Sequence, residues 1–127
     1  MPSSWLFKTE ASDYAFEDLV REGRTRWEGV RNPTALIHLR GVRKGDAVMI
    51  YHTGNVKAVI GLARAATDSK DDAVDLVPDR PLARPVTLAE IRKNPKLKTL
   101  DLVRITRLSV MNVTAAHWAE LIRMSAT

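Results

Sequence analysis

Two apolar runs of strand length, joined by a short turn, constrain the fold of this chain more than any other feature. The first run covers residues 47–52 and the second covers residues 56–66. The turn Thr53-Gly54-Asn55 between them holds polar and glycine residues that favour a reversal of the chain. Gly61, inside the second run, predicts a bend or a close approach of another segment to the backbone. The pattern therefore predicts a β-hairpin built from two long strands.

Shorter elements are predicted on both sides of this hairpin. Strand-favouring residues indicate the strands, and helix-capping residues indicate the helix starts. Pro78, Pro81 and Pro85 interrupt two of the strands and are typical of a sheet edge. Strands are predicted over residues 3–9, 74–77, 82–86 and 100–110, and helices over residues 16–22 and after Asn32, Thr87 and Thr114. For a chain of 127 residues this predicts a single α+β domain over residues 1–127, a mixed β-barrel with short helices packed outside and at its ends.

Charge and composition narrow the partners. The net charge is +5 and the sequence pI is about 9.9, which favours polyanions such as nucleic acid, although a basic surface also serves solubility. The chain has no cysteine, so disulfides, thiolate nucleophiles and cysteine zinc sites are excluded, and a reducing compartment is favoured. No apolar run is long enough to cross a bilayer, and no signal-like segment opens the sequence. These features predict a cytoplasmic protein with no membrane partner.

Five segments, in order along almost the whole chain, resemble the EVE domain family. The most specific is Arg26-Trp27-Glu28-Gly29-Val30-Arg31-Asn32, through its pattern Trp-x-Gly-Val-Arg-Asn. The others are Trp5-Leu6-Phe7-Lys8-Thr9-Glu10, the stretch from Gly45-Asp46 to Tyr51-His52-Thr53, Arg84-Pro85-Val86-Thr87-Leu88 and Leu108-Ser109-Val110-Met111. The resemblance implies a PUA-like barrel, related to YTH and ASCH domains, whose pocket receives modified bases, particularly modified cytosines. The chain departs from the family pattern at Ala11, where proline is common, and at Thr53, where serine is frequent and the added methyl group would narrow the pocket.

A pocket for a flipped base needs an aromatic wall for stacking together with fixed hydrogen-bond donors and acceptors. Trp27 and Tyr51 are candidates for the wall, and Lys8 is a candidate donor. The predicted base pocket comprises Lys8, Thr9, Glu10, Trp27, Val30, Arg31, Asn32, Tyr51, His52, Thr53, Ser109, Val110 and Met111. The predicted phosphate contacts are Arg26, Arg31, Arg43, Lys44 and Arg107. The predicted partner is DNA or RNA that carries a modified base, and protein partners stay open.

Simpler interpretations compete for three of these residues. Trp27 is equally compatible with a place in the core, because large aromatic side chains are usually buried. Asn32 precedes a proline and needs no ligand, since it is a good helix cap. His52 follows an apolar strand and is compatible with a satisfied buried histidine.

Two other classes of function stay open besides a non-catalytic reader. Lys8, Glu10 and His52 form the best catalytic set, which would make the chain a small enzyme of nucleic-acid or nucleotide metabolism. The second class is a protein-binding adaptor, in which the basic patches would bind an acidic protein and no nucleic acid would be involved. Paired histidine spacings, nucleophile elbows and phosphate-binding glycine loops are all missing, so neither a metal nor a cofactor is predicted.

Overall fold

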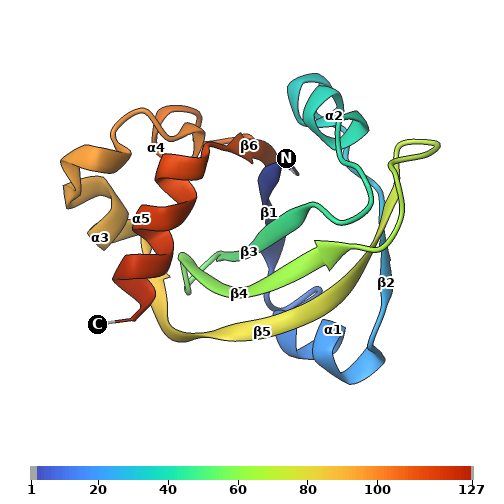
Figure 1. Cartoon of the computed structure of the whole chain (residues 1–127), viewed down its shortest axis with the longest axis horizontal. Helices are drawn as coiled ribbons and strands as arrows, with labels where there is room; N and C mark the ends of the chain where they lie inside the picture. The colour runs from blue at the N-terminus through green and yellow to red at the C-terminus, as the bar shows by residue number, and fades with distance from the viewer. Residues whose placement is uncertain (1–2, 127) are drawn as a thin grey trace.

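The computed structural model describes residues 3–126 and arranges them as a curved, mixed six-stranded half-barrel (Figure 1). The strand order is β2-β5-β4-β3-β1-β6, in which β1 and β3 are parallel and the other neighbours antiparallel. The strands are β1 (Ser4–Glu10), β2 (Thr25–Trp27), β3 (Ala47–Thr53), β4 (Ala58–Ala65), β5 (Val74–Thr87) and β6 (Val110–Val113). The α+β class and the PUA-like mixed barrel predicted from the sequence are confirmed, and the observed barrel is a half-barrel.

Short helices lie at two ends of the sheet. Figure 1 shows α1 and α2 on one side, and α3, α4 and α5 together on the other. The helices are α1 (Phe16–Glu22), α2 (Pro33–Arg40), α3 (Leu88–Lys93), the 3₁₀ turn η1 (Pro95–Leu97), α4 (Asp101–Arg104) and α5 (Ala115–Ser125). The three predicted capping side chains accept backbone N–H groups as expected: Asn32 from Ala35, Thr87 from Glu90 and Thr114 from His117. Within residues 3–126 no helix has the length and apolar character that crossing a bilayer requires.

The hairpin predicted at the centre of the sequence is the β3–β4 pair, and it is confirmed. Gly61 lies under Phe16, the first residue of α1. A Cβ atom on Gly61 would come within 2.6 Å of the Phe16 ring, so only glycine fits there without a shift. The glycine therefore allows α1 to pack directly on the sheet, as the sequence predicted for a close approach.

The prolines lie in one long strand, whereas the sequence predicted two short ones. β5 runs for 14 residues through Pro78, Pro81 and Pro85. β2 pairs only with residues 74–76 of β5. Along the stretch that contains the prolines, β4 is therefore the one described strand beside β5. Proline has no N–H to donate, and the register between β4 and β5 shifts twice in this stretch. The prediction of a sheet edge was correct, but the predicted break was wrong.

The predicted strand over residues 100–110 is also wrong for most of its length. Residues 101–104 form α4, and β6 begins only at Val110. Leu100 and Leu102 are both buried, and their alternation resembles a strand. The Leu100 carbonyl instead accepts the N–H groups of Val103 and Arg104, which is a helical pattern.

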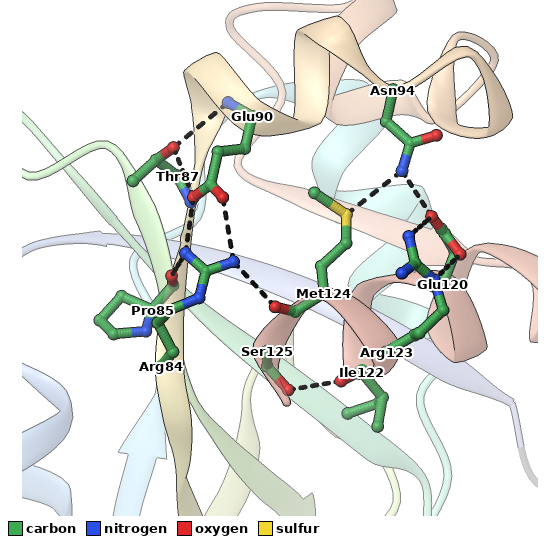
Figure 2. Close-up of polar contacts among 10 residues, drawn as sticks. All are labelled: Arg84, Pro85, Thr87, Glu90, Asn94, Glu120, Ile122, Arg123, Met124 and Ser125. Atoms are coloured by element: carbon green, nitrogen blue, oxygen red, sulfur yellow. Dashed lines mark hydrogen bonds and ion pairs between the residues drawn. The ribbon is translucent and has the colours of Figure 1, made fainter. Parts of the chain in front are cut away.

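A polar network joins β5, α3 and α5 at one end of the molecule (Figure 2). Arg84 pairs with Glu90 at 3.0 Å and donates to the Met124 carbonyl at 2.9 Å. On the other side of α5, Glu120 accepts from Arg123 and from the side chain of Asn94. These partners lower the pKa of both Glu90 and Glu120 to about 2. The network fixes the C-terminal helix to the sheet.

Candidate functional site

A cavity of about 370 Å³ opens between β1, β2 and the loop that leads to α2. We call it the Trp27 cavity. Its volume lies within the roughly 300–1,000 Å³ of small-molecule pockets. It is lined by Lys8, Thr9, Tyr14, Thr25, Arg26, Trp27, Glu28, Gly29, Val30, Arg31 and Ser109. Residues from four separate stretches of the sequence therefore meet at one place.

Trp27 is the aromatic wall of this cavity. Its ring packs against Phe7 with centroids 5.5 Å apart, and Tyr14 meets it edge-on at 6.2 Å. The residue is half-buried and touches the core, while its ring also lines the cavity. Trp27 thus combines features of both interpretations, because it packs against the core and also lines a cavity. The core contacts hold its ring in one orientation.

Lys8, Thr9 and Ser109 supply polar groups next to the aromatic wall. The Lys8 ammonium donates to the Thr106 carbonyl at 3.0 Å, which leaves two of its N–H groups for other partners. Burial lowers the pKa of this ammonium. The Thr9 hydroxyl donates to the Tyr14 carbonyl at 2.7 Å and keeps its lone pairs as acceptors. The Ser109 hydroxyl bonds to no other described residue.

The loop after β2 forms the rim of the Trp27 cavity. Gly29 has φ +81°, a left-handed conformation that glycine adopts without strain, so it allows the sharp turn out of β2. Arg26 and Glu28 pair at 2.9 Å on the surface. Arg31 is exposed and forms no ion pair with another described residue. The rim therefore presents one unpaired positive charge.

Four lining residues were not predicted as site residues: Glu28 and Gly29, which lie inside the motif that ends at Asn32, and Tyr14 and Thr25, which lie outside every motif. Tyr14 lies in a turn, and its hydroxyl donates to Glu22 at 2.6 Å. The pKa of Tyr14 is raised, mainly by burial and next by the hydrogen bond to the Glu22 carboxylate. Thr25 belongs to a strand of three residues, which is too short to show an alternating pattern. No local signal in the sequence identifies either residue.

Several residues of the predicted pocket lie elsewhere in the structure. Tyr51 and Thr53 line a second cavity of about 170 Å³, which Lys8 also lines. We call this the Tyr51 cavity. Val110 and Met111 are fully buried, and neither lines a cavity. The structure thus separates most of the predicted set into the Trp27 cavity, the Tyr51 cavity and the core, and Glu10 and Asn32 belong to none of these.

Asn32, Glu10 and His52 have structural partners of their own. Asn32 caps α2 through its side-chain oxygen, 3.0 Å from the N–H of Ala35, which confirms the simpler interpretation. Glu10 accepts from the Thr53 hydroxyl at 3.1 Å. His52 is buried, and its Nε2 accepts the Phe16 N–H at 3.0 Å, so it is a satisfied core histidine.

The structure does not gather the alternative catalytic set of Lys8, Glu10 and His52 around one cavity. Lys8 lines both cavities, whereas Glu10 and His52 line neither of them. Burial lowers the pKa of His52, and the nearby charges of Glu17 and Glu10 oppose that shift. Residues 3–126 contain no group of three or more His, Cys, Asp or Glu side chains able to surround a metal ion.

The predicted phosphate contacts lie at two ends of β1. Arg26 and Arg31 line the Trp27 cavity, and Arg107 lies in the segment between Thr106 and Ser109. Arg43 and Lys44 precede β3, whose first residues lie beside the start of β1. Lys8, which lines the Trp27 cavity, is four residues beyond Ser4, the first residue of β1. Arg43 and Lys44 are therefore separated from the Trp27 cavity by about 13 Å of strand length.

The sequence matches the family model of the EVE domain over residues 3–124. No curated protein sequence gives a significant match.

Solved structures resemble the chain over nearly its whole length. An NMR structure of Rpa0253 from Rhodopseudomonas palustris is 32% identical, with a TM-score of 0.91 over 98% of this chain and 93% of that one. A crystal structure of Atu2648 from Agrobacterium tumefaciens is 31% identical, with a TM-score of 0.91 over 97% and 92%. Human THYN1, crystallised in complex with DNA containing 5-methylcytosine, is 23% identical, with a TM-score of 0.89 over 98% of both chains.

Proposed function

The chain belongs to the EVE domain family, and we propose that it is a nucleic-acid-binding reader that takes a modified nucleobase, a modified cytosine above all, into the Trp27 cavity. The observation that carries this proposal is the placement of Trp27. Its ring packs against Phe7, and the residue lines a cavity that Lys8 and four hydroxyl-bearing residues also line. A flat apolar wall with a few fixed polar groups is what recognition of a flipped base requires.

The polar groups suit the edge of a cytosine. Cytosine presents an amine that needs an acceptor, and ring acceptors that need donors. The Glu28 carboxylate accepts from Arg26 through Oε2 and keeps Oε1 as an acceptor, and the Lys8 ammonium and the Ser109 hydroxyl are available as donors. Val30 is the one aliphatic side chain among the lining residues, and it offers an apolar contact for a methyl group on the base. In this proposal Val30 distinguishes the modified base from the plain one.

Two further observations support nucleic acid as the partner. Human THYN1, whose fold this chain shares, was crystallised with DNA containing 5-methylcytosine. The net charge of +5 and the unpaired Arg31 at the rim favour contact with phosphates. DNA and RNA both carry these features, so the proposal covers either.

The proposed domain, residues 1–127, binds its ligand without converting it. Glu10 and His52, which would act as acid and base in an enzyme, are engaged by Thr53 and Phe16 and line neither cavity. The proposed location is the cytoplasm, on the basis of the cysteine-free sequence.

A binding panel tests this function. Fluorescence anisotropy is measured with oligonucleotides of one sequence that carry cytosine, 5-methylcytosine or 5-hydroxymethylcytosine, in DNA and in RNA, and each sample is then analysed by mass spectrometry. The proposal predicts tighter binding to at least one modified form and no change in ligand mass. Equal affinity for every base would refute base reading. A product of altered mass would support the enzyme instead.

A further inference from the structure

Three basic residues line the Tyr51 cavity, as three line the Trp27 cavity, but the Trp27 cavity also has an acidic lining residue, Glu28. Lys8, Lys57 and Arg92 converge on the Tyr51 cavity from β1, the β3–β4 turn and α3. None of its described lining residues is acidic, although the Thr53 hydroxyl donates to the Glu10 carboxylate, which also lies against Gly54. Three cations beside one carboxylate favour a compact anion.

Two of the three cations interact with Tyr51, and all three line the same cavity. The Lys8 ammonium lies 5.8 Å from the centre of the Tyr51 ring and keeps free N–H groups beyond its bond to Thr106. Burial raises the pKa of the Tyr51 hydroxyl, and the charge of Arg92 opposes this shift. Neither Lys57 nor Arg92 forms an ion pair with another residue that the structure describes.

The backbone at Lys57 also indicates a local role. Lys57 has φ +50°, a left-handed conformation that asparagine or glycine adopts at less cost. Its carbonyl accepts the N–H of Leu88 at 2.8 Å, so this conformation ties the turn to the start of α3. The turn thus brings the Lys57 side chain to the same cavity as Arg92.

We propose that the Tyr51 cavity binds a phosphate group of the nucleotide whose base occupies the Trp27 cavity. The inference rests on the proposed reader function and adds the phosphate site to it. Lys8 lines both cavities, so the two sites adjoin at this residue. A nucleotide carries its phosphate one sugar away from its base, which fits one group in each of two adjoining sites. The phosphate belongs either to an oligonucleotide strand or to a free nucleotide.

Two variants remove the charges with little change to the fold. Lys57→Asn deletes the ammonium and keeps a residue that tolerates a left-handed backbone, and Arg92→Gln deletes the guanidinium on an exposed helix position. Lys93→Gln is the matched control, because Lys93 is the next residue on the same helix but does not line the Tyr51 cavity. Each protein is titrated with 5-methylcytosine nucleoside, with its 5′-monophosphate and with an oligonucleotide containing that base.

The phosphate site predicts, in both variants, unchanged nucleoside affinity and about ten-fold weaker binding of a ligand that carries the phosphate. Where that ligand is the oligonucleotide, its salt slope is expected to fall by about one. A loss for the monophosphate alone identifies a free nucleotide, a loss for the oligonucleotide alone identifies the strand phosphodiester, and a loss for both shows that either phosphate is accepted. Equal weakening of nucleoside and oligonucleotide would overturn the assignment, as would wild-type affinity for both the monophosphate and the oligonucleotide.

Inorganic phosphate provides a readout that does not depend on base reading. Titration of the wild type is predicted to shift the backbone amide signals of Gly54 and Lys57 in two-dimensional NMR spectra, and Arg92→Gln is predicted to abolish those shifts. Shifts without discrimination among bases in the binding panel would refute the reader function and leave the phosphate site standing. Discrimination among bases without these shifts would refute the phosphate site alone.

Discussion

Truncation of Trp27 separates the contribution of its ring to the fold from its contribution to binding. Complete removal of a buried tryptophan costs about 3–5 kcal/mol. Trp27 is half-buried against Phe7 and Tyr14, so for Trp27→Ala we expect about 2 kcal/mol of lost stability, equivalent to a fall in Tm of about 8 °C. A domain with an unfolding free energy of about 5–15 kcal/mol remains folded in the cold after such a loss.

The same substitution removes the surface on which a base would stack. Stacking on an aromatic side chain is worth about 1–3 kcal/mol, so affinity for a modified oligonucleotide is expected to fall roughly ten- to hundred-fold. Affinity is measured by calorimetry at low temperature, and the folded state is checked by circular dichroism in the same buffer. Trp27→Phe retains an aromatic face and is expected to recover most of the affinity.

Trp118→Ala is the matched control. Trp118 lies on α5, is also half-buried against the core, and lines neither the Trp27 cavity nor the Tyr51 cavity. Its truncation is expected to lower Tm by a similar amount and to leave affinity unchanged. The reasoning is refuted if Trp27→Ala binds as tightly as the wild type while folded, or if Trp118→Ala loses as much affinity as Trp27→Ala.

Four further predictions follow from other parts of the molecule. Burial holds the native pKa of His52 below its ordinary 6.5, so the unfolded state binds more protons and stability is expected to fall as pH drops below about 6.5. Denaturant titrations of the wild type and of His52→Gln test this, and an unchanged pH dependence in the variant would count against it. Glu120 has a native pKa of about 2 against an ordinary 4.5, so the stability from its charged form is present above pH 4.5 and is lost as pH falls towards 2. Glu120→Gln should therefore reduce the pH dependence of the free energy of unfolding between pH 4.5 and pH 2. Gly61→Ala is expected to cost about 1–3 kcal/mol because its Cβ would meet Phe16, and less in a Phe16→Leu background; equal costs in both backgrounds would contradict the packing argument. Oligonucleotide affinity is expected to fall linearly with the logarithm of salt concentration, and a salt-independent affinity would exclude phosphate contacts.

The parts of the fold that could be predicted are those with strong local signals. The β3–β4 hairpin follows from two apolar runs and a turn, and the helices that begin after Asn32, Thr87 and Thr114 follow from capping side chains. The errors arose where tertiary packing overrides the local pattern. Leu100 and Leu102 alternate as in a strand but are buried at the start of a short helix and within it. The prolines of β5 stay in one strand because, among the described strands, β2 pairs only with residues 74–76 of β5 and leaves that side of the proline stretch without a paired strand.

The candidate site was predictable in part for a related reason. Lys8 and Thr9 at the end of β1 and the segment from Trp27 to Arg31 carry distinctive motifs, and these residues do meet at one cavity. Tyr14 reaches the same cavity from a turn that has no motif. Strand alternation separates the predicted residues of β3: Tyr51 and Thr53 line the Tyr51 cavity, whereas His52 between them is buried against Phe16.

The most direct test of the central claim is a crystal structure of this chain bound to an oligonucleotide that contains 5-methylcytosine. The account predicts the modified base flipped out of its strand, stacked on the Trp27 ring, with its methyl group against Val30 and its edge near Lys8 and Ser109. A base that stays within its strand, or that is bound away from the Trp27 cavity, would contradict the account.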